Sequence, residues 1–206
     1  MRGFILNLKR VREEDLIVVV LTPFSVKSYY RFYGSRHSIL QIWNLIDFEE
    51  VKSNGFFLDR IKGVSQIPFD WIYSKNRLLI WQNLIKSLYF HLKDSSNLDS
   101  FYFELLLKIA KRWNKQNPKR LFCEAYCEIL RFEGRLSCQR CSICNKKIDS
   151  KLISISKNFI TSHPECVNSF LIDREKIKYL FTNAKTTKLE DSQIELLYNI
   201  ALAGFD

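Results

Sequence analysis

The N-terminal third of the chain alternates short apolar runs with polar turn segments, a pattern typical of β-strands. The runs are rich in β-branched and aromatic residues. The predicted strands cover residues 2–10, 16–22, 26–33, 37–51 and 56–69. Pro23 ends the second strand, because proline has no N–H to donate to a β-ladder. Five strands within about seventy residues predict a small Greek-key barrel of the OB type.

The apolar period changes from two to 3.6 near Trp71, which predicts helices. One helix carries its apolar stripe over residues 78–92, and a second is expected over residues 99–113. A third begins after Asn117, which serves as the cap with proline at the first helical position, and ends at Gly134. Short links between these helices predict a compact bundle, so the fold class is α+β.

The C-terminal third combines a short ribbon-like run with two more helices. Asp173 is expected to cap a helix over residues 174–181. Thr187 and Glu190 have the spacing of a capping box for a last helix that ends near Ala201. The predicted domains are a barrel at 1–70, a helical bundle at 71–136, a cysteine-rich segment at 137–170, and C-terminal helices packing on the bundle at 171–206.

Two ligand pairs in the cysteine-rich segment predict a zinc site. Cys141-x2-Cys144 and His163-x2-Cys166 supply four sulfur and nitrogen donors, as a tetrahedral Zn²⁺ site requires. Their spacing fits a two-knuckle pattern. Asn145 tolerates a positive φ, which a tight metal knuckle needs, and so favours Cys141 and Cys144 as the first pair. We expect one structural zinc per chain.

Other interpretations of these residues remain open. Cysteines can be small buried hydrophobes, although three within a polar, basic segment make a poor core. A disulfide framework is disfavoured because no long apolar leader directs the chain to an oxidising compartment. The four cysteines also have the spacing of an iron–sulfur ligand run, with Cys138-x2-Cys141-x2-Cys144 followed by a distant Cys166. In the zinc interpretation Cys138 is the spare ligand. A lone His163 could be structural, but its spacing from Cys166 favours ligation.

Known catalytic motifs are absent from the sequence. It contains no Gly-rich phosphate loop, no G-x-S-x-G and no H-E-x-x-H. Four protein ligands would leave zinc no position for an activated water, so a structural role is expected. Dispersed acids could in principle form a two-metal nuclease site, but their spacing does not indicate one. Cys123 and Cys127 share a face of an apolar helix and are expected in the core.

Composition narrows the class of partner. The chain has 206 residues, 47% of them apolar, and a net charge of +10. Its apolar runs are far shorter than the roughly eighteen residues of a membrane span, so we expect a cytoplasmic protein. A surplus of cations usually seeks a polyanion, and nucleic acid is the leading candidate. Excess lysine without functional meaning is the alternative.

The third predicted strand interleaves basic and aromatic residues, as OB barrels do where they bind single strands. Alternate side chains share a face, so we expect an outer face of Lys27, Tyr29, Arg31 and Tyr33. Tyr30 and Phe32 would point inward. An ordinary solvated strand face is the alternative. The expected DNA-binding residues of domain 1–70 are Lys9, Arg10, Arg12, Lys27, Tyr29, Arg31, Tyr33, Arg36 and His37.

The order of these parts resembles the RecO family. The resemblance is carried by Gly3-Phe4, Glu14-Asp15, Leu21-Thr22, Arg36-His37-Ser38, and Phe132-Glu-Gly134 leading into Cys141-x2-Cys144. The family commonly has a second Cys-x2-Cys preceded by a glycine pair, whereas this chain has His163-Pro164 there. Some members of the family lack the cysteines. The resemblance therefore does not imply that zinc is needed for activity rather than for stability.

The resemblance implies a bacterial recombination mediator and not an enzyme. Such proteins bind single- and double-stranded DNA, anneal complementary strands, and load RecA onto coated single strands. The implied partners are RecR and the C-terminal tail of single-strand-binding protein. We expect the acidic tail to dock in an apolar, basic pocket of the helical bundle.

Overall fold

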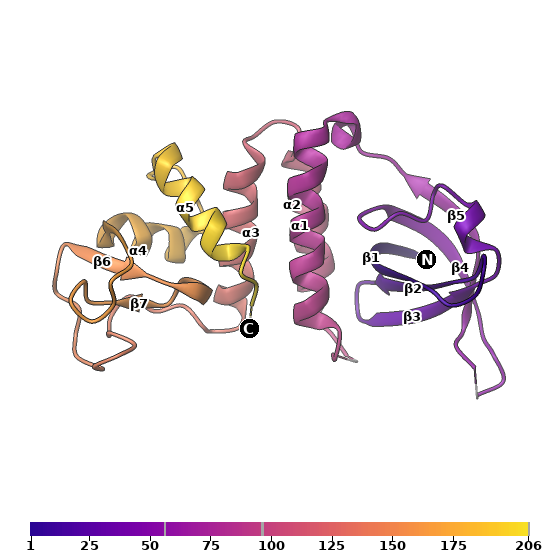
Figure 1. Ribbon diagram of the computed structural model, residues 1–206, viewed down its shortest axis with the longest axis horizontal. Helices are drawn as coiled ribbons and strands as arrows, with labels where there is room; N and C mark the ends of the chain where they lie inside the picture. Colours follow the sequence, from indigo (N-terminus) through magenta and orange to yellow (C-terminus); the bar gives the residue numbers. More distant parts are fainter. Residues whose placement is uncertain (56, 96, 206) are drawn as a thin grey trace. The chain divides into compact units, whose positions relative to one another are not determined.

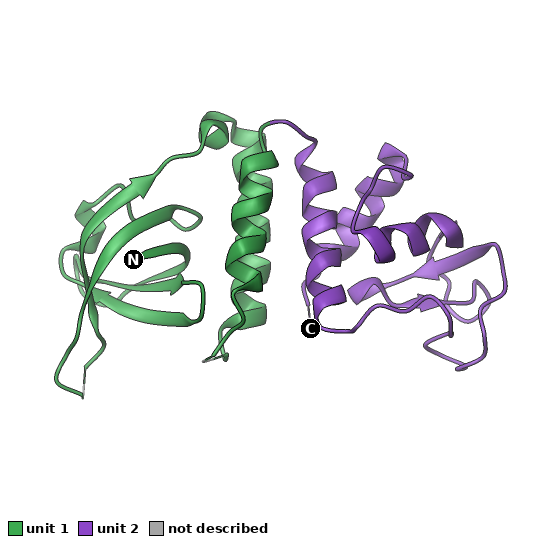
Figure 2. Ribbon diagram, turned by 180° about the vertical axis from the view of Figure 1, so that it is seen from behind, with its two compact units in different colours: residues 1–114 green, residues 115–206 purple. Residues whose placement is uncertain are grey.

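The computed structural model describes residues 1–55, 57–95 and 97–205. The chain forms two compact units, residues 1–114 and residues 115–206 (Figure 2). The boundary falls inside the segment that was expected to form a single bundle: two of its helices group with the barrel and the third with the C-terminal elements. The finer domain limits stay a prediction.

The first unit begins with a closed five-stranded barrel of the OB type (Figure 1). Its strands are β1 (Arg2–Arg10), β2 (Leu16–Leu21), β3 (Val26–Arg31), β4 (Leu45–Val51) and β5 (Arg60–Ile67). They follow the order β1-β2-β3-β5-β4, and β3 pairs in parallel with β5 at Tyr30 and Arg60. The apolar alternation fills the barrel with buried side chains such as Ile5, Val20 and Ile46. The predicted barrel and its strand number are confirmed.

Two strands are shorter than predicted. Residues 37–44 form turns instead of the first half of a long strand. Leu40 of this segment nevertheless packs into the barrel core. β3 stops early because Tyr33 adopts a left-handed φ of 50° and leads into a 3-10 turn. Phe56, where the fifth strand was expected to begin, lies outside the described residues.

Helices α1 (Lys75–Leu92) and α2 (Phe101–Arg112) complete the first unit. A cluster of tryptophans joins them: Trp81 lies 5.1 Å from Trp71 and 5.0 Å from Trp113, measured between ring centroids. Phe4 of β1 contacts Trp81 at 6.1 Å. The aromatic side chains therefore fix α1 against the barrel as well as against α2.

The second unit packs helices around a small antiparallel sheet. Its elements are α3 (Pro118–Phe132), β6 (Leu152–Ile155), β7 (Thr161–Ser162), β8 (Phe170–Asp173), α4 (Arg174–Asn183) and α5 (Asp191–Ala201). The sheet order is β7-β6-β8. The Asn117 side chain caps α3, and Gly134 ends this region with a φ of 69°, as predicted. Cys123 and Cys127 are fully buried, which confirms them as core.

One predicted cap in the second unit is right and another is wrong. Asp173 accepts from the backbone N–H of Glu175 at 2.8 Å and caps α4. The box expected from Thr187 to Glu190 is displaced by three residues. Glu190 is itself the cap, and its N–H donates to the Gln193 side chain at 3.1 Å. Among the described helices, none has the length and apolar character to cross a membrane.

Candidate metal centre and nucleic-acid interface

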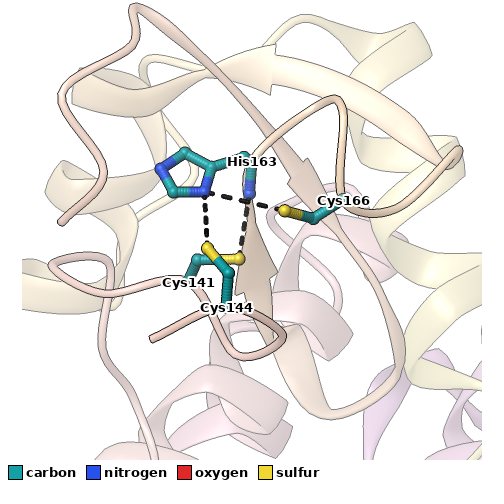
Figure 3. A group of neighbouring side chains, drawn as sticks. All are labelled: Cys141, Cys144, His163 and Cys166. Carbon is teal, nitrogen blue, oxygen red and sulfur yellow. Dashed lines mark hydrogen bonds between the residues drawn. The ribbon is translucent and has the colours of Figure 1, made fainter. Parts of the chain in front are cut away.

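Four side chains converge in the second unit as a Cys3His group (Figure 3). The ligand atoms of Cys141, Cys144, His163 and Cys166 all lie within 4.8 Å of one another. His163 Nδ1 is 3.3 Å from Cys144 Sγ and 3.9 Å from Cys166 Sγ. A tetrahedron with Zn–S bonds near 2.3 Å has edges of about 3.5–3.8 Å. The group is therefore compatible with one zinc ion.

Local backbone geometry brings the two ligand pairs together. Asn145 has a φ of 56° and donates its N–H to the Cys141 carbonyl at 2.9 Å, which closes the first knuckle as the sequence predicted. The N–H of Cys141 donates to Lys146 O at 2.9 Å. Strand Thr161–Ser162 ends immediately before His163 and delivers the second pair. Each pair is thus held by its own tight turn.

Hydrogen bonds around the ligands suit a metal. His163 Nε2 lies 3.0 Å from the carbonyl oxygen of Lys147, which can only accept, so Nε2 carries the proton and Nδ1 faces the other ligands. Burial opposes ionisation of Cys141, but backbone N–H groups of Cys144, His163 and Ile143 outweigh it and lower its pKa to about 5. A thiolate is the form that binds zinc.

Cys138 does not join the Cys3His group, although it lies only three residues before Cys141. It lines a separate hollow of the second unit. The alternative with four cysteine ligands for an iron–sulfur cluster therefore loses its first ligand. The arrangement brings together the four ligands that spacing predicted and leaves the spare one aside.

The outward position expected for Tyr29 is wrong. Only 1% of Tyr29 is exposed, its ring lies 5.4 Å from Phe48, and its hydroxyl donates to Glu50 at 3.3 Å. Lys27, two residues earlier, reaches the rim of the barrel and pairs with Glu50 at 2.8 Å and Asp59 at 2.5 Å. On this face of β3, Tyr29 therefore points into the closed barrel, and Lys27 near the start of the strand forms ion pairs.

The opposite face of β3 is the exposed one. Phe32, expected inside, is 47% exposed, and its ring contacts Tyr30 edge-on at 4.9 Å. The Tyr30 hydroxyl donates to Asp15 at 2.5 Å. Arg31, expected outside, donates from its guanidinium to Ile61 O at 3.0 Å. Alternation separated the two faces correctly, but Tyr29 and Phe32 lie on the reverse sides from those expected, whereas Tyr33 is exposed as predicted.

A hollow of about 670 Å³ lies on this exposed face, and we name it the aromatic groove. Its lining residues are Arg12, Tyr30, Phe32, Lys52, Ser53, Asn54, Phe57, Leu58 and Arg60. They come from the β1–β2 loop, β3, the β4–β5 loop and β5, the region where OB folds bind oligonucleotides. Phe57 is 80% exposed, and the Arg60 guanidinium lies 5.8 Å from the Phe32 ring. The groove combines exposed aromatic rings with cations.

An ion-pair cluster holds the loop that carries Phe57. Asp59 accepts from the backbone N–H of Ser53 at 2.8 Å, from Lys27 at 2.5 Å and from Lys52 at 3.3 Å. The hydrogen bond from Lys27 is the main cause that keeps the pKa of Asp59 well below its usual range. Lys27, predicted as a DNA contact, is therefore already engaged in fixing this loop.

The remaining predicted DNA-binding residues lie around the barrel. Lys9 and Arg10 are exposed at the end of β1. Tyr33 is exposed, and the Arg36 guanidinium lies 5.1 Å from its ring. His37 Nε2 is 3.4 Å from the Arg31 guanidinium. Of the predicted residues, only Arg12 lines the aromatic groove.

Sequence reasoning named only Arg12 of the aromatic groove, and so missed its exposed rings Phe32 and Phe57 and its cations Lys52 and Arg60. A usable signal was present, because Phe57 directly follows the polar turn around Gly55, where an aromatic ring has little core to join. Arg60 became part of the groove only through the pairing of β3 with β5. That pairing joins residues thirty apart in the chain, Tyr30 and Arg60.

Comparison with known families assigns the barrel. Residues 1–72 match the family model described as RecO N terminal, which covers all five strands. A search of curated proteins gave no match.

Proposed function

We propose, from the premise that the N-terminal domain of this chain belongs to the RecO family, that the protein is a DNA-binding recombination mediator. In this role it anneals complementary strands. Together with RecR, it helps to load RecA onto single-stranded DNA coated by single-strand-binding protein. The chain acts by binding and positioning strands and not as an enzyme.

The aromatic groove is the observation that carries the proposal. Bases stack on exposed rings regardless of their identity, and Phe32 and Phe57 offer such rings. Arg12, Lys52 and Arg60 supply cations beside them for backbone phosphates. A site of this kind binds single strands with little sequence preference, as a mediator acting along any broken chromosome requires.

The proposed metal is one structural zinc per chain, held by Cys141, Cys144, His163 and Cys166. All four donors come from the protein, so the ion would tie the first knuckle to the end of β7 without an open position. Elemental analysis of purified protein should find one zinc per chain. Iron in its place would contradict the assignment.

We place the acidic tail of single-strand-binding protein in an apolar hollow of about 510 Å³ beside α1. Trp43, Tyr89 and Phe90 line it together with Lys86, which suits a peptide that carries both apolar side chains and a carboxylate. A labelled tail peptide should bind wild-type protein and lose affinity with Phe90→Ala. Equal affinity for both proteins would remove the tail from this hollow.

Salt titration tests the DNA-binding part directly. The affinity for labelled oligo-dT should fall steeply between low and physiological salt, because phosphate neutralisation releases counterions. A flat response would contradict the proposal. Annealing of complementary strands and RecA loading in the presence of RecR and single-strand-binding protein then test the mediator role.

Two other functions give different results in the same assays. A zinc-dependent nuclease would cut labelled DNA with Mg²⁺ or Mn²⁺, whereas a mediator leaves the strands intact and annealed. A zinc-stabilised protein adaptor would bind its partner without affinity for DNA.

A further inference from the structure

A second cationic hollow lies in the C-terminal unit, remote in sequence from the barrel. It measures about 640 Å³, and we name it the arginine pocket. Its lining residues are Arg131, Gly134, Leu136, Ser137, Cys138, Gln139, Arg140, Lys147, Ile148, Arg174, Lys178, Phe181 and Thr182. Five of these are cations and none is an acid. Neither the zinc ligands nor the proposed DNA site uses this pocket.

Backbone carbonyl groups orient the three arginines. Arg131 donates to Thr182 O at 2.8 Å, Arg140 donates to Asn145 O at 3.1 Å, and Arg174 donates to Ile148 O. A guanidinium has five N–H donors, so one such bond fixes its plane and leaves most donors available. Because a carbonyl is neutral, it leaves the positive charge of the arginine in place.

The acids near the pocket compensate its charge only in part. Lys147 pairs with Asp149 at 2.9 Å, and Glu175 lies 3.7 Å from Lys178 and 3.6 Å from Arg174. Within the described part of the chain, these two acids therefore pair with three of the five cations. Exposed pairs of this kind contribute little to stability, so a stronger anion can displace them.

The pocket also has apolar walls. Leu136, Ile148 and Phe181 line it between the cations. Its volume is in the range of small-ligand sites, enough for about one nucleotide. A phosphodiester gives arginine a bidentate partner, and the attached base can cover an apolar wall. The pocket thus has the chemistry of a nucleotide site, with cations for the phosphate and carbon surface for the base.

We infer that the arginine pocket binds backbone phosphates of single-stranded nucleic acid, as a second contact separate from the barrel. The inference rests on the proposed DNA-binding function and extends it to the C-terminal unit. Two sites in one chain would let the protein hold a strand at two points.

Charge-removing variants test the inference with the full chain. Arg131→Gln combined with Lys178→Gln removes two pocket cations. Lys151→Gln combined with Lys188→Gln removes two exposed cations of the same unit that do not line the pocket. Each lost phosphate contact costs about fivefold in affinity near 0.1 M salt, so the pocket pair should weaken oligo-dT binding roughly 25-fold. The control pair should leave the affinity close to that of the wild type.

Cys138 provides a second measurement on unaltered protein. Its thiol lines the pocket and lies outside the Cys3His group. Saturating oligo-dT should slow maleimide modification of Cys138, as followed by mass spectrometry of its peptide. DNA held by the barrel alone would leave this rate unchanged, so the readout remains decisive even if the pocket variant fails to fold.

The outcomes separate the two proposals. If wild-type protein does not bind oligo-dT, both are overturned. Suppose instead that the wild type binds oligo-dT, that Phe32→Ala weakens this binding, and that Cys138 stays unprotected. Then only the pocket inference fails. Protection of Cys138 by poly-glutamate but not by oligo-dT would also overturn it, because the pocket would then accept an acidic peptide.

Discussion

Replacement of Phe32 by alanine removes an exposed ring from the lining of the aromatic groove. The ring is 47% exposed, and it contacts the Tyr30 ring at 4.9 Å and the Arg60 guanidinium at 5.8 Å. An aromatic pair contributes about 0.5–1.5 kcal/mol. An exposed cation–π contact contributes about 0.5–1 kcal/mol. We therefore expect Phe32→Ala to fold with only a modest loss of stability.

The expected loss in DNA binding is larger than the loss in stability. A base stacked on an aromatic side chain contributes about 1–3 kcal/mol. At about 1.4 kcal/mol for each tenfold change, this range corresponds to roughly a 5- to 150-fold increase in Kd for oligo-dT. The ring carries no charge, so the slope of log affinity against log salt should stay that of the wild type.

Fluorescence anisotropy with labelled oligo-dT over a series of salt concentrations measures both quantities. Phe24→Ala is the control, because Phe24 is an exposed phenylalanine of the β2–β3 turn that does not line the groove. Arg60→Gln should behave differently from both, lowering the salt slope by about 0.7 through the loss of one phosphate contact.

Equal affinity of Phe32→Ala and wild type would refute stacking at this ring. Equal losses for Phe32→Ala and Phe24→Ala would refute the special role of the groove. Thermal unfolding of each variant shows that the comparison is made between folded proteins.

Three further predictions follow from the site geometry. Tyr29→Phe should leave oligo-dT affinity unchanged, whereas Tyr29→Ala should lower the free energy of unfolding by about 3–5 kcal/mol in a denaturant titration, because Tyr29 is core. Since the pKa of Asp59 is lowered, its pairing with Lys27 contributes stability above pH 4 that is lost as the pH falls through the folded pKa. Acid titration of Lys27→Met should show a shallower loss, and an identical profile would contradict the pairing. Cys144→Ser should reduce the zinc content and the unfolding temperature, whereas Cys138→Ser should keep one zinc per chain; equal zinc loss in both would place Cys138 among the ligands.

The Cys3His group was predictable because its determinants are local. Cys141 and Cys144 are three residues apart, and Asn145 supplies the positive φ that closes the turn between them. His163 and Cys166 repeat the arrangement. Only one short ribbon separates the second ligand pair from the first along the chain, so the two pairs are constrained to lie close together. The same locality made the number of barrel strands readable from turns and alternation.

The aromatic groove depended on the tertiary structure. Alternation along β3 divides Tyr29 from Phe32, and both faces carry aromatic rings. The cations Lys27 and Arg31 lie only on the face of Tyr29, so the pattern favours that face as the outer one. Closure of the barrel decides otherwise, because the pairing of β3 with β5 buries Tyr29 against Phe48 and leaves Phe32 beside Arg60. The sequence by itself determined the barrel, the helices and the Cys3His group. Only the folded barrel decided which rings line the exposed groove, since that choice depends on contacts between strands far apart in the chain.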